Sequence, residues 1–159
     1  MGCDIHIYIE YKVGDAPWVH DEIHAVESDN GYTHVNDHPN GGRDYQLFSK
    51  LAAVRGDGPR PKGTPKDASD RVKLAVKCWD EDGHSHSYHS LKTFQAKVKS
   101  CGHYGKAAAG HSYGDYVDLI AHCHEQVKKR HLDAEIEKLL LGPNINTEVK
   151  CRLVYFFDN

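Results

Sequence analysis

The first ten residues alternate between apolar and polar side chains. The apolar set is Cys3, Ile5, Ile7 and Ile9, and the other set is Asp4, His6, Tyr8 and Glu10. Successive side chains of a β-strand point to opposite faces of its sheet. The pattern therefore predicts a strand with one face in the core.

Two further segments resemble strands. Residues 149–157 are almost continuously apolar, which predicts a strand close to the end of the chain. A turn over 14–17 precedes residues 18–26, which alternate and are expected to form the hairpin partner of the first strand.

Four segments have helical spacing. We expect a short helix over 44–55, one from an N-cap at Ser69 towards Trp79, and one beginning at Ser90. A long helix should follow Ser112 and end at Gly142. Its apolar residues are Tyr116, Ile120, Cys123 and Val127, followed by Leu132, Ile136, Leu139 and Leu140.

Two segments resemble long loops. Residues 28–43 are rich in Asn, Asp, Gly and His, and residues 56–65 contain three prolines and several glycines. With strands at both ends and helices between them, the sequence predicts an α+β fold. We expect one domain over 1–159, with a mainly antiparallel sheet formed by the N- and C-terminal strands and packed against helices, with long loops.

Composition narrows the class of protein. A chain of 159 residues is long enough for a core without disulfide bonds. A net charge of −3 argues against binding to bulk nucleic acid, and no apolar run reaches the length of a membrane span. We expect no membrane partner and, without a secretory signal, a cytoplasmic location. Five scattered cysteines favour reduced, mostly buried thiols.

Histidine is unusually frequent, with 13 residues. Asp4 and His6 lie two residues apart, and the segment 79–90 contains a dense group of acidic and imidazole side chains. That group is Asp80, Asp82, His84, His86 and His89. On an extended segment His84 and His86 share a face, so two Asp/His pairs from separate elements could hold one Zn²⁺, Mn²⁺ or Fe²⁺. Such an ion activates a bound water.

Other interpretations of the 79–90 segment stay open. It could be a solvated His/Ser loop that binds nothing, or it could act without metal as an acid/base group or a nucleotide contact. In the metal hypothesis Asp4, His6, His84 and His86 are the ligands. Asp80 or Asp82 then completes the coordination shell or acts as the catalytic base.

Cations and aromatic residues flank the two loops. Arg43, Arg55 and Lys62 could neutralise a phosphate group, although scattered surface charges are the simpler explanation. Trp79 and Tyr45 could stack on a base. The helical spacing of Tyr45 with Phe48 also fits a core position.

Five segments together resemble an uncharacterised family found in bacteriophage and bacterial genomes. They are MGCDIH, RDYQLFSKLAAVR, PKGTPKDAS, WDEDGHSHS and the terminal FFDN. The resemblance implies a phage or bacterial cytoplasmic setting and brings no established activity.

Asp4-Ile5-His6 and Gly83-His84-Ser85-His86 are also similar to the D-x-H and G-H-x-H motifs of calcineurin-like metallophosphoesterases. The GDxxD and GNHD/E motifs between them are missing, and half of the chain follows the second motif. The likeness therefore implies shared ligand chemistry and not a shared fold.

Three functional hypotheses follow. The first is a metal-dependent hydrolase of a phosphate ester, with a small, possibly cyclic nucleotide as substrate. The second is a phage-encoded binding protein, a sponge, that sequesters a host immune-signalling nucleotide without turnover and forms a homo-oligomer. The third is a protein-interaction inhibitor.

Overall fold

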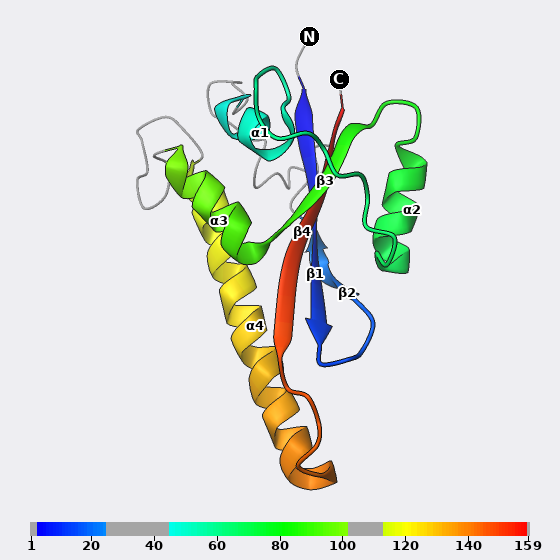
Figure 1. The fold of residues 1–159 in the computed structure, drawn as a ribbon, viewed down its shortest axis with the longest axis vertical. Coiled ribbons are helices and arrows are strands. Elements are labelled where there is room, and N and C mark those ends of the chain that lie inside the picture. The colour runs from blue at the N-terminus through cyan, green and yellow to red at the C-terminus, as the bar shows by residue number, and fades with distance from the viewer. Residues whose placement is uncertain (1–2, 25–44, 102–112, 159) are drawn as a thin grey trace.

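The computed structural model describes residues 3–24, 45–101 and 113–158. These contain four strands and four helices (Figure 1). The strands are β1 (Asp4–Val13), β2 (Val19–His24), β3 (His84–Ser90) and β4 (Val149–Asp158). The helices are α1 (Tyr45–Ala52), α2 (Asp70–Cys78), α3 (Leu91–Ser100) and α4 (Tyr113–Leu141). The predicted loop over 28–43 lies outside the described residues.

The strands form one antiparallel sheet in the order β2-β1-β4-β3. The N- and C-terminal strands pair along their whole length, from Asp4 opposite Asp158 to Val13 opposite Val149. The predicted α+β fold, with a sheet built on the terminal strands and packed against helices, is confirmed.

Helices cover both faces of this sheet. In Figure 1 the sheet is seen nearly edge-on, with α1, α3 and α4 on one side and α2 on the other. The alternating residues Ile5, Ile7 and Ile9 of β1 are buried in the larger core with α1, α3 and α4. The opposite face carries Tyr8 and Phe156 into a smaller core with α2.

The beginnings of α2 and α3 differ in their capping. Ser90 accepts a hydrogen bond from the Thr93 N–H at 3.2 Å and caps α3 as predicted. Ser69 occupies the N-cap position of α2, but its hydroxyl makes no capping bond. Its backbone N–H instead donates to the Glu10 carboxylate at 2.6 Å.

Strand β3 contains a β-bulge. His84 lies opposite Phe157 and Ser87 opposite Tyr155, so Ser85 and His86 together face one residue, Phe156. Ser85 has a φ of 54°, in the left-handed region. The alternative of a solvated loop is wrong for residues 84–90, which form a sheet strand, whereas residues 79–82 form a turn with 80–82 exposed.

The long helix α4 has two different halves. Tyr116, Ile120 and Cys123 are buried against the sheet, whereas Leu132, Ile136 and Leu139 are exposed. The helix ends at Leu141, and Gly142 follows with a φ of 136°, as the sequence predicted. No helix in the described part of the chain has the length and apolarity needed to cross a bilayer.

The strain at the bulge can be measured. A side chain in the left-handed region costs about 1 kcal/mol, which glycine avoids. Ser85 also contacts His84 Nδ1 through its hydroxyl at 3.0 Å, so serine itself is not the right reference. We expect Ser85→Gly to be more stable than Ser85→Ala by about 1 kcal/mol in urea unfolding. Equal stabilities would contradict this assignment of strain.

Candidate functional site

His6 lies on the α2 face of the sheet, directly opposite Phe156. Its ring stacks on Phe156 at 5.1 Å between centroids and lies 4.5 Å from the Trp79 ring. Its Nε2 is 2.9 Å from an Asp158 carboxylate oxygen. His6 is therefore a buried imidazole held by a carboxylate and two aromatic rings.

His86 lies on the other side of Phe156, 5.1 Å between ring centroids. His6 and His86 thus flank the same phenyl ring from strands that are two positions apart in the sheet. That separation corresponds to about 10 Å at the usual strand spacing. Zinc–nitrogen bonds are about 2 Å long, so these two imidazoles do not share an ion in this arrangement.

His84 lies on the opposite face from His86. It stacks over Phe157 at 6.2 Å, and its Nε2 is 3.7 Å from the Cys3 sulfur on the α1 side of the sheet. The expectation that His84 and His86 share a face is wrong, because the bulge at Ser85 reverses the alternation.

The remaining predicted metal-site residues do not complete a cluster. Asp80 and Asp82 are exposed between α2 and β3. Asp4 lies at the start of β1, but its side chain is not described. Among the described residues no three His, Cys, Asp or Glu side chains are arranged to hold a metal ion. The Zn, Mn or Fe site stays a prediction, and its three described ligands, His6, His84 and His86, are not brought together.

The predicted phosphate-binding and stacking residues are spread out. Tyr45 accepts a hydrogen bond from the Cys3 N–H at 3.0 Å and packs edge-on to Phe48. Arg55 lies over the Tyr45 ring at 4.4 Å. Trp79 packs on the His6 side of the sheet, and Arg43 lies outside the described residues. Among the described ones, Tyr45 and Arg55 are in contact, whereas Trp79 packs elsewhere, beside His6.

Lys62 contacts β3. Its ammonium donates to the Tyr88 carbonyl at 3.1 Å and lies 3.4 Å from Nδ1 of the buried His89. On the other side of the ring, His89 Nε2 is 3.3 Å from the Leu51 carbonyl. Neutral His89 satisfies both contacts, with Nε2–H donating and Nδ1 accepting. Lys62 therefore links the proline-rich loop to the edge strand.

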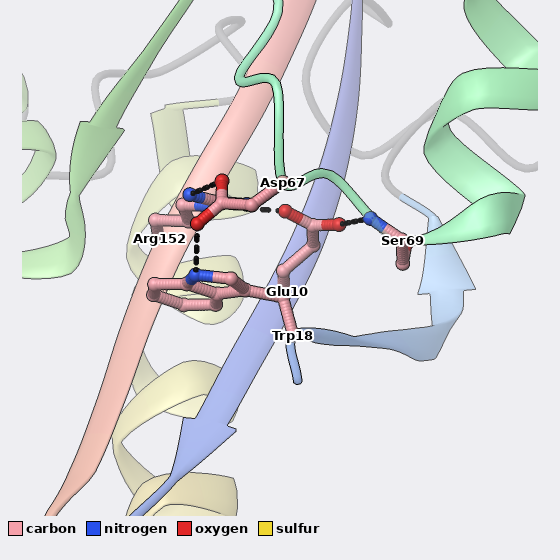
Figure 2. A network of polar contacts seen from close by, with 5 residues as sticks. All are labelled: Glu10, Trp18, Asp67, Ser69 and Arg152. Atoms are coloured by element: carbon pink, nitrogen blue, oxygen red, sulfur yellow. Dashed lines mark hydrogen bonds and ion pairs between the residues drawn. The ribbon is translucent and has the colours of Figure 1, made fainter. Parts of the chain in front are cut away.

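The unpredicted feature is an ion pair between the two central strands (Figure 2). Arg152 on β4 donates through Nε to the fully buried Glu10 at 2.8 Å, and through Nη1 to Asp67 at 3.0 Å. Trp18 donates to the same Asp67 carboxylate at 3.1 Å, and the Arg152 guanidinium lies 3.8 Å from the Trp18 ring centre. We call these residues and Ser69 the Arg152 network.

Within the described part of the chain, two hydrogen-bonding atoms of the network are not used, the hydroxyl oxygen of Ser69 and Nη2 of Arg152. Nη2 of Arg152 is buried and has no partner within the described structure. The side chain is only 8% exposed, so solvent offers it little compensation. Leaving a buried charged donor without a partner costs free energy.

Arg152 also lines a groove with a volume of about 840 Å³, here called the Arg152 groove. Trp18 and Tyr88 form one side, and the beginning of α3 and the middle of α4 contribute to the other. Its charged residues are Lys92, Lys150 and Arg152, against Glu148. Arg152 is already paired with Glu10 and Asp67, so the positive charge that this groove offers to a ligand comes from the two lysines.

The groove follows an unpaired edge of β4. The ladder between β3 and β4 ends at Ser90 opposite Arg152, where the chain turns into α3. From Val149 to Cys151, β4 is paired in the described structure with β1 alone. Alternate residues of an antiparallel strand direct their backbone groups to opposite sides, so part of this edge is open to the groove.

Sequence reasoning missed the Arg152 network, although a signal was present. Arg152 is a charged residue inside an apolar strand, and Glu10 ends the alternating set of the first strand. Buried charges require partners, so the two could have been paired in advance. Trp18 and Asp67 have no comparable signal.

The cysteines have structural positions. Cys3, Cys123 and Cys151 are buried thiols, as expected, whereas Cys78 is exposed. A hydrogen bond with Cys123, together with burial, raises the pKa of Cys151. This thiol therefore stays protonated and unreactive.

Comparisons with known proteins gave no relative: no family model matches the chain, and neither a curated protein nor a solved structure is similar to it.

His89 gives the fold a measurable pH dependence. Burial and the Lys62 charge lower the pKa of His89 from 6.5 to about 4 in the folded protein. Between these values the unfolded chain binds the extra proton, so the free energy of unfolding falls as the pH drops from about 6.5 to about 4. We expect His89→Gln to flatten this dependence, measured by urea unfolding at neutral pH and at about pH 4.5.

His86 contributes in the same direction, because burial lowers its pKa as well. The flattening in His89→Gln should therefore be partial. Lys62→Gln, which keeps the imidazole and removes the facing charge, should give a smaller effect. An unchanged slope in His89→Gln would contradict the assignment.

The Glu10–Arg152 pair can be tested by a double-mutant cycle. Glu10→Leu leaves the buried guanidinium without its main partner, and we expect it to destabilise the protein by about 3–5 kcal/mol. Glu10→Leu with Arg152→Leu should recover most of that loss, because no buried charge remains. Asp67→Asn, at the exposed end, should cost about 1 kcal/mol or less. If the double variant lost as much free energy of unfolding as the two single variants together, the result would contradict this interaction.

Proposed function

We propose that this protein binds a small anionic ligand with a planar ring, such as a nucleotide, in the Arg152 groove and releases it unchanged. The observation that carries the proposal is the gathering of cationic and aromatic side chains along one groove, lined by Lys92, Lys150, Arg152, Trp18 and Tyr88. Phosphate and carboxylate oxygens are the natural partners of such cations.

The walls of the groove fit the rest of such a ligand. Trp18 and Tyr88 offer aromatic surfaces for a base, and stacking contributes about 1–3 kcal/mol per base. The volume lies within the range of small-molecule sites, roughly 300–1,000 Å³. Aromatic and cationic side chains are therefore gathered at one surface of suitable size.

The attraction for an anion comes mainly from the two lysines. Glu10 and Asp67 already balance the charge of Arg152. Lys92 and Lys150 are exposed, and Glu148 opposes only one of them. Their effect is long-range and screened by salt, so affinity should fall as ionic strength rises.

The hydrolase hypothesis has weaker support. Its ligands His84 and His86 lie on opposite faces, and Phe156 separates His6 from His86. Binding without turnover needs none of these residues. In the phage or bacterial setting that the resemblance implies, the ligand would be a host signalling nucleotide, sequestered rather than consumed.

The open edge of β4 favours a second candidate function. An extended peptide could add to the unpaired edge between Val149 and Cys151 and place its side chains in the same groove. Amide hydrogen exchange separates the two ligands. A peptide strand would slow exchange of the backbone amides on this edge of β4, whereas a nucleotide would leave those amides unchanged.

Calorimetric titration with a panel of linear and cyclic nucleotides tests the main proposal. Lys92→Glu and Lys150→Glu should each weaken binding by about tenfold, because each reverses a charge facing the anion. Lys73→Glu is the matched control, since Lys73 is an exposed lysine on α2 outside the groove. The proposal fails if no nucleotide binds or if both groove variants bind as well as the control.

The fate of the ligand separates binding from hydrolysis. The protein is incubated with ligand and Mn²⁺ or Zn²⁺, then denatured, and the ligand is analysed by mass spectrometry. Recovery of intact ligand supports sequestration. Cleaved ligand that depends on His6 or His86 supports the hydrolase.

A further inference from the structure

The outer surface of α4 carries a concentration of exposed apolar side chains. Seven large apolar residues in the described part of the chain are exposed, and five of them lie within the last ten residues of this helix. They are Leu132, Ile136, Leu139, Leu140 and Leu141. Single exposed leucines are ordinary, but a cluster of this kind marks an interaction surface.

Leu132, Ile136 and Leu139 form one stripe, because they are spaced four and three residues apart. The stripe faces away from the sheet. Ala134 is buried and Arg130 lies over the Tyr11 ring, so the inner face of the helix passes through these two positions. At about 100° per residue, Leu132 lies on the opposite side of the helix. Figure 1 shows this half of α4 extending past the N-terminal end of α3, where α3 follows β3.

Within about one turn of Leu132, the charges on the two sides of the stripe change sign, whereas the exposed Glu125 lies on the stripe itself two turns earlier. Lys128 and Glu135 follow one flank, and Lys129 and Asp133 follow the other, by the same helical spacing. The basic members precede Leu132 in the chain, and the acidic members come after it. The stripe is therefore complementary to its own reversed copy.

We propose that a second copy of this chain docks on this surface, with the two α4 helices antiparallel and crossing near Leu132. In that arrangement each flank of the stripe lies beside the same flank of the other copy. Lys128 of one copy faces Glu135 of the other at a level about one residue apart, and Lys129 faces Asp133 at a level about two residues apart. Leu132 packs on its counterpart at the two-fold axis, and Ile136 packs on the aliphatic stem of Lys128.

Parallel pairing is disfavoured by the same charges. It brings Lys128 next to Lys129 of the other copy and Asp133 next to Glu135, so like charges meet on both flanks. A lipid surface is also a poor occupant, because the acidic residues beside the stripe repel anionic headgroups. The charge order thus selects an antiparallel copy.

The test is the molar mass of the full-length protein in solution, measured by sedimentation equilibrium over about 1–200 µM, the range for a small helix-pair interface. We expect a concentration-dependent dimer. Leu132→Glu should weaken it by about tenfold or more. Leu74→Glu is the matched control, since Leu74 on α2 has the same exposure, 59% against 60%. Circular dichroism verifies that both variants are folded.

Charge exchange tests the antiparallel register. Lys129→Glu and Asp133→Lys should each weaken the dimer, and the double variant should restore it. A wild-type protein that stays monomeric at the highest concentration would overturn the proposal, as would a dimer unaffected by Leu132→Glu. Binding to vesicles of anionic or neutral lipid that is lost in Leu132→Glu would assign the surface to membranes and also overturn it.

Discussion

The pairing of β1 with β4 fixes most of what is distinctive in this molecule. The ladder runs from Asp4 opposite Asp158 to Val13 opposite Val149, and its register sets which side chains meet on each face. It places His6 opposite Phe156 and Glu10 opposite Arg152. A slip by one residue would turn the isoleucines of β1 out of the larger core and separate the buried charges. The hydrophobic pattern and the ion pair therefore specify the same register.

The Glu10–Arg152 pair specifies this register at a cost in free energy. Two charges lose their hydration on the α2 face, and packed apolar residues could fill that space at no loss of stability. The pair is nevertheless well satisfied at the carboxylate, which accepts from Arg152 at 2.8 Å and from the Ser69 N–H at 2.6 Å. The second bond joins the beginning of α2 to the sheet. One buried carboxylate thus links β1, β4 and α2, the three elements that enclose the smaller core.

The sequence predicts the fold well because the fold follows from the spacing of apolar residues and from the residues at which helices and strands end. The alternation in residues 3–9, the apolar run near the end of the chain and the stop at Gly142 are local signals, and each is confirmed. The candidate site depends on non-local geometry instead. Simple alternation predicts that His84 and His86 share a face. A single residue in the left-handed region, Ser85, reverses this alternation. Nothing in a single sequence fixes the position of that bulge.

The order of the strands separates two of the predicted metal ligands, His6 and His86, in the same way. β4 lies between β1 and β3, and it brings Phe156 between His6 and His86. The sequence predicts that the two terminal strands pair. It does not predict which strand pairs with the other edge of β4. The histidines nevertheless share an environment. His6, Phe156, His86 and Trp79 form an aromatic layer under α2, and burial lowers the pKa of His86 within it. Histidine here serves as a flat, partly apolar residue.

The unpaired edge of β4 has an ordinary explanation that must be weighed against a ligand. Exposed strand edges attract other chains, and lysines placed on them reduce that hazard. Lys150 on the edge and Lys92 beside it fit this role. Protection of an edge does not, however, account for the aromatic rings of Trp18 and Tyr88, which line the same groove. We therefore propose that the two lysines serve ligand binding as well as protection of the edge.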